Sequence, residues 1–352
     1  MELGLFSFGD YSPELFGDDA VTPDQRVRNL LEEMVLADQV GLDFFGLGEH
    51  HRPDFLVSSP VTVLAAAAVL TKRIRLSTAV TVMSSEDPVR VFQQFATLDQ
   101  LSNGRAEIMA GRGSFIESFP LFGYDLDDYE ELFTEKLDLL LALTKGGEHV
   151  HWKGSGKFRA PLTGQSIQPR PVQKELPVII AVGGSPESAA RAGTLGLPLA
   201  IAIIGGQPAR FQPFVDYYRE AGAKAGHSPD KLKVTINQHG FLAEDSQAAA
   251  DLVWPSYKLM VDKLGRERGW PPQGRPHFEH GRGKFGHLVV GSPQEAIDKI
   301  LAEHELFHMD RFAIQFTVGG SHHKEVLKSI ELFGTVVAPA VKKALGTAPV
   351  AK

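Results

Sequence analysis

Three consecutive residues that can move protons or bind ions, Glu49, His50 and His51, follow one glycine after a short apolar run at residues 44–47. The run has the length of a buried strand, so this triplet stands where a strand ends. It could supply a general base with supporting groups, a pair of metal ligands, or ordinary hydrogen-bonded side chains. Adjacent side chains of an extended segment point to opposite faces, so at most one histidine would face a ligand. Spacing does not say which one.

A single arginine, Arg112, stands between Gly111 and Gly113 and is followed by Ser114. Its planar guanidinium matches the oxygens of a phosphate or a carboxylate, and the glycines let the backbone approach a ligand closely. A plain turn would explain the same residues. The segment is not a dinucleotide-binding fingerprint, because no third glycine follows at the required spacing.

A third segment begins with Gly183 and Gly184 and continues into Ser185, which opens a predicted helix that also contains Ser188. Free backbone N–H groups at a helix start bind phosphate readily, and two hydroxyl groups stand beside them. Simple N-capping by Ser185 explains the pattern as well. From the residues alone, a phosphate cradle and an ordinary helix cap both stay open.

The elements that must position these groups alternate between strands and helices along the chain. Apolar runs of strand length occur at residues 3–8, 44–47, 74–82, 105–110, 177–181, 199–204, 232–242 and 312–316. Segments with helical periodicity separate them, opened by capping signals such as Thr22-Pro23 and Asp87-Pro88. This alternation predicts a (β/α)8 TIM barrel, in which catalytic side chains stand at the carboxyl ends of the strands.

We expect one domain over residues 1–352, because no linker divides the chain into two halves. Insertions of about 146–177 and about 254–287 follow the fourth and the seventh strand. The first predicts a small hairpin around residues 154–156. The second is rich in Pro, Gly and basic residues and would serve as a lid. We expect its charged and titratable side chains to be mostly solvated: Arg275, His277, His280, Arg282, Lys284 and His287.

Composition limits the partners of the chain. A net charge of -7 and the lack of a basic run argue against nucleic acid as a main partner. No cysteine is present, so disulfides and thiolate chemistry are excluded. The start lacks the pattern of a signal peptide, and no apolar run reaches the roughly 18 residues that a membrane span needs. We expect a soluble cytoplasmic protein that acts on small molecules.

Several motifs, in order and over nearly the whole chain, resemble those of the bacterial luciferase-like flavin monooxygenases. They lie at residues 44–51 (FFGLGEHH), 77–82 (STAVTV), 87–90 (DPVR), 98–105 (LDQLSNGR), 111–113 (GRG), 184–188 (GSPES), 195–198 (LGLP) and 290–293 (VGSP). The combination is far more specific than any one motif. The resemblance implies a (β/α)8 barrel that binds FMN at the carboxyl ends of its strands.

The activity implied by this resemblance is an FMN-dependent monooxygenation. Reduced FMN, supplied by a separate NAD(P)H-dependent flavin reductase, and molecular oxygen would oxygenate a small organic substrate, with the second oxygen atom leaving as water. The flavin would carry the redox chemistry while the protein excludes water. Relatives pair through helices beside the second and third strands, so we expect a homodimer. The organic substrate is not readable from the sequence, because loop residues determine it.

The resemblance also assigns roles to individual residues. His50 matches the catalytic histidine of the family, with Glu49 and His51 beside it. A non-proline cis peptide on the third strand falls between Ala79 and Val80 and would make room beside the flavin ring. The remaining cofactor positions match contacts to the phosphate, the ribityl chain or the ring: Arg112, Gly113, Ser114, Gly183, Gly184, Ser185, Ser188 and Asn237.

One position departs from the family pattern. Luciferases proper carry a second phosphate-binding arginine at the position where Glu130 stands here. The phosphate charge would then rest more on Arg112 and on backbone donors. Neither the long-chain aldehyde substrate of luciferase nor light emission is therefore expected.

Three alternatives remain. A deazaflavin-dependent dehydrogenase or reductase would keep the barrel without oxygen chemistry, although the Glu-His-His triplet looks more like the monooxygenase branch. A metal-dependent barrel hydrolase would use both histidines of the triplet and His239. Such enzymes tend to end their first strand with a His-x-His pair, whereas this chain has Phe8-Gly9-Asp10 there. A non-catalytic flavin-binding subunit would not need the intact triplet. We expect no metal site.

Overall fold

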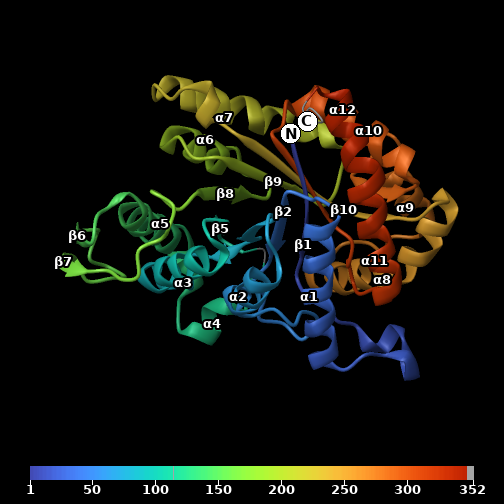
Figure 1. Cartoon of the computed structure of the whole chain (residues 1–352), viewed down its shortest axis with the longest axis horizontal. Helices are drawn as coiled ribbons and strands as arrows, with labels where there is room; N and C mark the ends of the chain where they lie inside the picture. The colour runs from blue at the N-terminus through green and yellow to red at the C-terminus, as the bar shows by residue number, and fades with distance from the viewer. Residues whose placement is uncertain (114, 347–352) are drawn as a thin grey trace.

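The backbone closes into a barrel of parallel strands (Figure 1). Within residues 1–113 and 115–346, the part of the chain described by this computed structural model, eight strand positions form the ring β1-β2-β3-β5-β8-β9-β10-β12, and β12 pairs back with β1. β4 continues β3 and pairs with β5, while β11 adds to β10. All these pairings are parallel, as strand and helix alternation requires. The predicted (β/α)8 barrel is confirmed.

The strands that build the ring and its additions are short and mostly buried. Their bounds are β1 (Glu2–Ser7), β2 (Phe44–Leu47), β3 (Arg75–Thr78), β4 (Thr81–Val82), β5 (Ala106–Gly111), β8 (Val178–Val182), β9 (Leu199–Ile203), β10 (Val234–Leu242), β11 (Leu288–Gly291) and β12 (Arg311–Gln315). A separate antiparallel pair consists of β6 (His149–Trp152) and β7 (Leu162–Ser166).

Helices cover the outside of the ring (Figure 1). They are α1 (Pro23–Gln39), α2 (Pro60–Leu70), α3 (Pro88–Ser102), α4 (Ser118–Phe122), α5 (Tyr129–Lys145), α6 (Pro186–Leu195), α7 (Gln212–Lys224), α8 (Ser246–Arg268), α9 (Arg275–Arg282), α10 (Pro293–Phe307), α11 (His323–Leu332) and α12 (Ala338–Ala344). A π-helical turn, Phe333–Val337, joins the last two. Within the described part of the chain, the helices fall short of the length and apolar character that a membrane span requires.

Helix starts coincide with predicted capping residues. Asp87 accepts hydrogen bonds from the backbone N–H groups of Val89 and Arg90 at the start of α3. Ser292 and Glu295 form a complete capping box at the start of α10. Such caps contribute about 0.5–2 kcal/mol each by satisfying N–H groups that have no partner inside the helix. These local signals therefore fix where the helices between the strands begin.

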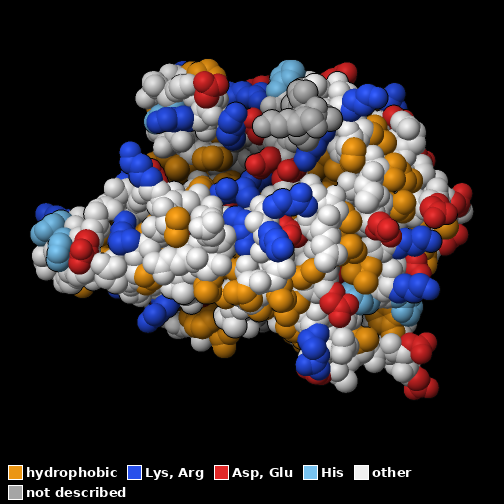
Figure 2. All heavy atoms as spheres, in the orientation of Figure 1, with side chains coloured by type: hydrophobic (Ala, Val, Ile, Leu, Met, Phe, Trp, Pro, Cys, Tyr) orange, Lys and Arg blue, Asp and Glu red, His pale blue; other side chains and the backbone are white. Residues whose placement is uncertain are grey.

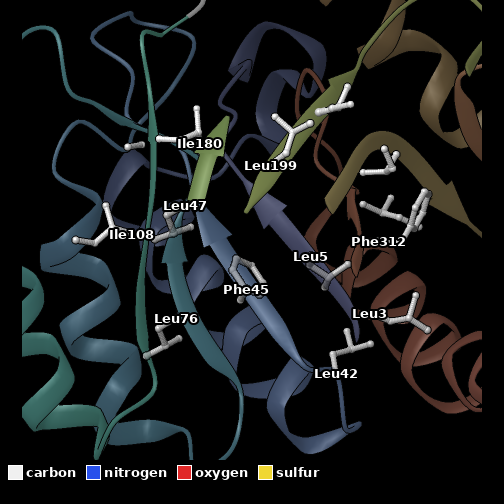
Figure 3. Close-up of a cluster of buried hydrophobic side chains, with 14 of the residues drawn as sticks. Leu3, Leu5, Leu42, Phe45, Leu47, Leu76, Ile108, Ile180, Leu199 and Phe312 are labelled. Atoms are coloured by element: carbon white, nitrogen blue, oxygen red, sulfur yellow. The ribbon is translucent and has the colours of Figure 1, made fainter. Parts of the chain in front are cut away.

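Strand alternation divides the buried side chains between two cores. Outward-facing side chains pack beneath the helices, and Figure 3 shows Leu5, Phe45 and Leu76 on neighbouring strands within this larger core. Inward-facing side chains form a smaller cluster inside the ring: Phe6, Phe44, Met109, Ile179, Ala200 and Ala313. The interior of the ring is thus a packed layer, as is usual for barrels of this size.

Buried ion pairs close the amino-terminal end of the barrel. Glu107 on β5 accepts from Arg75 Nε at 2.8 Å and from Arg311, whose Nε also donates to Glu2 at 2.7 Å. We call these four residues the barrel floor. The Arg311 guanidinium lies 4.3 Å from the centroid of the Phe44 ring. Figure 2 shows basic and acidic side chains meeting in the upper half of the view, near the N-terminus marked in Figure 1.

Two connections extend beyond the regular pattern. The β6–β7 hairpin lies between α5 and β8 and projects from the side of the barrel, which confirms the predicted hairpin. Between β10 and α10 the chain forms α8, α9 and β11. The segment from residue 254, expected to be an insertion that serves as a lid, therefore starts inside a helix. α8 continues through Pro255 because Val253, Tyr257 and Val261 bury one face at helical spacing.

Candidate active site

A cavity of about 680 Å³ opens at the carboxyl ends of the barrel strands. Phe8, His50 and Gly183 line it from the ends of β1, β2 and β8, and Tyr257 and Trp270 line it from the region of α8. Small-molecule and cofactor sites have volumes of roughly 300–1,000 Å³. The cavity lies where catalytic sites of (β/α)8 barrels are found, as predicted.

His50 faces this cavity from aromatic surroundings. The centroid of its ring lies 4.5 Å from that of Phe8, 4.4 Å from that of Phe55 and 5.2 Å from that of Phe115. Burial lowers the pKa of His50 to about 3, and the charges of His51 and Arg52 act in the same direction. The imidazole is therefore neutral at pH 7, so one ring nitrogen can donate a hydrogen bond while the other accepts one.

Glu49 and His51 are engaged with each other. The Nε2 atom of His51 donates to Glu49 Oε1 at 3.0 Å, and the backbone N–H of Val82 donates to Glu49 Oε2 at 2.9 Å. Glu49 therefore connects the end of β2 to β4. Which histidine faces a ligand was open from spacing alone, and the structure turns His50 toward the cavity and His51 toward Glu49.

The third strand of the ring is interrupted beside the triplet. The peptide between Ala79 and Val80, which separates β3 from β4, is cis, so the predicted cis peptide is confirmed and the predicted unbroken strand is wrong. Both residues line the cavity. Glycines on the flanking strands allow this close approach. A Cβ at Gly48 would lie 2.9 Å from Ala79 O, and a Cβ at Gly111 would lie 2.9 Å from Val80 Cγ2.

Two arginines and one carboxylate form a cluster around Arg112, which lines the cavity. Arg112, in the loop after β5, donates to Glu130 Oε1 and, at 3.0 Å, to Ser188 Oγ. Arg191, on α6, donates to Glu130 Oε2 at 3.2 Å. The Arg112 guanidinium also lies 5.2 Å from the centroid of the Tyr129 ring. The sequence analysis missed Arg191, although its position three residues after Ser188 places both on one helix face.

The loop between β8 and α6 combines a helix cap with an open backbone. Ser185 caps α6, with its Oγ accepting from the Ser188 N–H at 3.3 Å. Gly183 and Gly184 line the cavity, and a Cβ added at either would meet no atom within 4 Å from the described residues beyond its two chain neighbours. Capping and a phosphate cradle are thus compatible here. Gly113 also lines the cavity, and Ser114 lies outside the described residues.

A polar wall extends from β10 to the start of β11. Asn237 and His239 line the cavity from alternate positions of β10, and their Oδ1 and Nδ1 atoms are buried without a hydrogen-bond partner in the described part of the chain. Burial lowers the pKa of His239 to about 3 and that of His287 to about 4. The expectation that His287 is solvated is wrong, because it leads directly into β11, which pairs with β10. Buried polar atoms without a partner suggest that a ligand supplies one.

Asp10 is a further residue that sequence analysis missed. Its carboxylate accepts from Gln315 Nε2 at 2.9 Å, from Thr317 Oγ1 at 2.9 Å and from the Gly319 N–H at 3.1 Å. Burial raises the pKa of Asp10 above its ordinary value. The carboxylate thus joins the ends of β1 and β12 and holds Gln315 at the cavity. The available signal was that Asp10 follows the first strand closely, as the triplet follows the second.

Ion pairs tie α8 to loops at the mouth of the cavity. Arg52 binds Glu117 after β5 and Glu267 on α8. Lys263 on α8 binds Asp54 at 2.7 Å. Partly exposed pairs of this kind contribute about 0–1 kcal/mol each. These ion pairs therefore connect the carboxyl-terminal half of α8, whose apolar face is buried, to the loops at the mouth of the cavity.

Neutral histidines in the cavity wall predict a pH-dependent stability. The folded-state pKa values of His50 and His239 lie near 3, against an ordinary value of 6.5. Above pH 6.5 both histidines are neutral in the folded and the unfolded chain. As the pH falls below 6.5, only the unfolded chain takes up protons, so stability is lost until the folded value is reached. At about pH 5 the loss amounts to about 2 kcal/mol for each histidine.

Urea unfolding of three proteins at about pH 7.5 and about pH 5 checks this expectation. Between these conditions, His239→Gln should lose about 2 kcal/mol less of its free energy of unfolding than the wild type. The control His149→Gln changes an exposed histidine on β6 and should follow the wild type. An identical loss in all three proteins would contradict the assignment of His239 as a buried neutral group.

Fold and site together define a barrel enzyme whose cavity joins aromatic walls to an end that is lined by Arg112. Among the described residues, no group of three or more His, Cys, Asp or Glu side chains is placed to hold a metal ion. Residues 1–308 match the family model of the luciferase-like monooxygenases. The chain belongs to this family, which confirms the resemblance seen in the sequence and makes the protein a flavin-dependent oxidoreductase.

Individual relatives align over most of their length. The protein y4vJ of Sinorhizobium fredii is 29% identical, covering 91% of this chain and 93% of the relative. The 4-hydroxyprotoasukamycin monooxygenase of Streptomyces nodosus subsp. asukaensis is 27% identical, with coverage of 95% and 91%. The crystal structure of monooxygenase RslO1 from Streptomyces bottropensis superimposes with a TM-score of 0.82 at 24% identity, covering 96% of this chain and 99% of that chain.

Other solved structures with the same fold differ in their cofactor. The oxygenating constituent of 3,6-diketocamphane monooxygenase of Pseudomonas putida, a type II Baeyer–Villiger monooxygenase solved with FMN, gives a TM-score of 0.77 at 20% identity, covering 97% of this chain and 98% of that chain. A secondary alcohol dehydrogenase that depends on the deazaflavin coenzyme F420 gives 0.72 at 20% identity, with coverage of 97% and 98%. The shared fold therefore accommodates either type of cofactor.

Proposed function

We propose that this protein is an FMN-dependent monooxygenase, which uses reduced FMN and molecular oxygen to oxygenate a small organic substrate. The observation that carries the proposal is a single cavity at the carboxyl ends of the strands. It joins the aromatic pocket of His50 to Arg112, Gly183 and Gly184, which form its proposed anion-binding end. A flavin mononucleotide has the matching parts, a flat aromatic ring at one end and a phosphate at the other.

The residues present fit FMN at both ends of the cavity. Arg112 offers a guanidinium to a phosphate, and the open backbone at Gly183 and Gly184 leaves space beside it. Asn237 offers a buried acceptor without a partner, which suits an N–H group of the flavin ring. Ala79 and Val80, between β3 and β4, line the cavity as well. The roles predicted for these residues and for Gly113, Ser185 and Ser188 are part of the proposal, as is the role of Ser114.

The chain's own contribution is to position groups and to control protons and water. When bound, reduced FMN supplies the redox chemistry with oxygen. Neutral His50 offers the reacting molecules a hydrogen-bond acceptor at one ring nitrogen and a donor at the other, a pair through which a proton can be passed. Glu49 and His51 hold the strand end that carries His50. The aromatic walls and α8 exclude water from the cavity.

Anaerobic titration with reduced FMN, followed by exposure to air, tests the proposal. The purified protein should bind reduced FMN, and the absorbance of bound flavin should return to the oxidised spectrum more slowly than that of free flavin. The deazaflavin coenzyme is titrated in parallel, because neighbours of the same fold depend on it. Binding of deazaflavin alone, with FMN oxidising as if free, would support the dehydrogenase alternative. Binding of neither cofactor would contradict both functions.

The same proposal includes the partner protein and the oligomeric state of this protein. We propose that a separate NAD(P)H-dependent flavin reductase supplies reduced FMN in the cytoplasm and that two copies of the chain form a homodimer. The diketocamphane enzyme is described as an oxygenating constituent, which is the form expected of an enzyme that receives its reduced flavin from another protein. Light scattering during size-exclusion chromatography checks the dimer. Turnover that persists with NADH and FMN, but without any added reductase, would contradict the separate supply.

Replacing Arg112 by glutamine should weaken FMN binding by about 10- to 100-fold, because a charge-assisted hydrogen bond contributes roughly 1.5–3 kcal/mol. Riboflavin lacks the phosphate, so its dissociation constant should not change. Fluorescence titration measures the dissociation constants of FMN and riboflavin for the variant and the wild type. Arg28→Gln, which changes an exposed arginine on α1, is the matched control. Equal weakening of FMN and riboflavin by Arg112→Gln would contradict a contact with the phosphate.

A further inference from the structure

Glu130 occupies a position between two cations at the anion-binding end of the cavity. One of its carboxylate oxygens binds Arg112 and the other binds Arg191, at 3.2 Å. Arg112 also binds the hydroxyl group of Ser188 at 3.0 Å, so the two guanidiniums, the hydroxyl and the carboxylate form one cluster. Arg112 of this cluster lines the cavity together with the open backbone of Gly183 and Gly184. A carboxylate thus uses the donors that a phosphate would need.

The carboxylate is free to leave this position. The side chain of Glu130 is 56% exposed, whereas those of Arg112 and Arg191 are 21% and 30% exposed. Glu130 stands in the first turn of α5, from which a rotation of its side chain reaches solvent without moving the helix. The arginines are held more firmly, because their guanidiniums lie near the rings of Tyr129 and Phe133. A phosphate can therefore replace the carboxylate while the arginines stay in place.

We propose that Glu130 competes with the phosphate of the flavin for Arg112 and Arg191 and thereby sets the affinity of the site for phosphorylated flavin. The proposal rests on the proposed function, because it takes FMN as the ligand of this cavity. In the free protein the carboxylate neutralises the two arginines. On binding, the phosphate takes over both ion pairs and the carboxylate turns to solvent. Binding is then weaker than two arginines alone would make it, which suits a flavin that must arrive reduced and leave oxidised.

Comparing FMN with riboflavin in two matched variants tests this competition. Glu130→Gln should tighten FMN binding by about tenfold, because FMN no longer has to break two ion pairs. Each of these partly exposed pairs can weaken the affinity by up to about fivefold. Riboflavin binding should stay unchanged. The control Glu131→Gln changes the neighbouring residue, which is also exposed and pairs with Lys157, and should alter neither flavin. The difference between wild type and Glu130→Gln should shrink at high salt.

Two further measurements test whether Arg112 and Arg191 both bind the phosphate. Inorganic phosphate, added as a competitor of FMN, should compete more strongly in Glu130→Gln than in the wild type. Arg191→Gln should weaken FMN without affecting riboflavin, which would establish it as the second cation of the site. Thermal unfolding of each variant shows that the fold is retained. These readouts depend on binding alone and need no organic substrate.

The outcomes separate this inference from the proposed function. If riboflavin binds normally but Glu130→Gln leaves FMN affinity unchanged or weakens it, Glu130 does not compete with phosphate and the inference is overturned. If neither flavin binds to the wild type, the proposed function fails and the inference fails with it. Tighter FMN binding in both Glu130→Gln and Glu131→Gln would indicate a general loss of negative charge at the start of α5, which also overturns the specific role of Glu130.

Discussion

Replacing His50 by glutamine is expected to lower turnover by about 100-fold or more, the range by which a positioned proton-transfer group accelerates a reaction. Glutamine keeps hydrogen-bonding capacity and much of the volume, but it cannot move a proton near neutral pH. The assay supplies reduced FMN through a flavin reductase and follows product formation from a substrate that the wild type oxygenates. The dissociation constant of FMN should change little, because the phosphate end of the cavity is unaffected.

His51→Gln is the matched control for this prediction. His51 is the adjacent residue, but its ring faces Glu49 and not the cavity. Its replacement removes one hydrogen bond to Glu49 while the Val82 N–H still holds the other oxygen. Turnover should therefore fall far less than in His50→Gln. Equal losses in the two variants would show that the triplet acts through the position of the β2 end and that His50 is not the proton-transfer group.

The largest expected effect on stability lies at the opposite end of the barrel. Arg311→Met should lower the free energy of unfolding by about 3–5 kcal/mol, because it leaves Glu107 buried with one of its partners removed. The side chains of Arg311 and Glu107 are only 8% and 3% exposed. Burial raises the pKa of Glu107, but the charges of Arg311 and Arg75 outweigh burial and bring it below its ordinary value. Chemical denaturation followed by circular dichroism measures the loss.

Two further variants show whether the loss comes from the unpaired charge. The double variant Arg311→Met with Glu107→Met removes both charges and should recover most of the stability, since well-packed apolar residues replace buried ion pairs at little cost. Lys233→Gln breaks an exposed ion pair, in which the side chains of Lys233 and Asp310 are 52% and 38% exposed. It should lower the free energy of unfolding by at most about 1 kcal/mol. A double variant as unstable as Arg311→Met alone would mean that packing and not charge dominates the barrel floor.

Local signals in the sequence were sufficient for much of the site. The apolar run before Glu49 places the triplet at a strand end, and the glycines around Arg112 and Ser185 mark the loops that line the cavity. These predictions depend on strand alternation, helix caps and turn residues, which act over a few neighbouring positions. The cis peptide at Ala79 required more, since it came from the resemblance of whole motifs to a known family.

The order of strands and helices, the (β/α)8 barrel and the strand ends that carry candidate residues were therefore predictable from the sequence. Which side chains meet is a property of the tertiary structure. Arg191 reaches Glu130 across 61 residues of the chain, and Arg311 reaches Glu107 across 204. It also decided that His50 faces the cavity and that His287 is buried against it. Such contacts depend on how the closed ring brings distant strands and loops together and on the direction of each side chain, which no local pattern encodes.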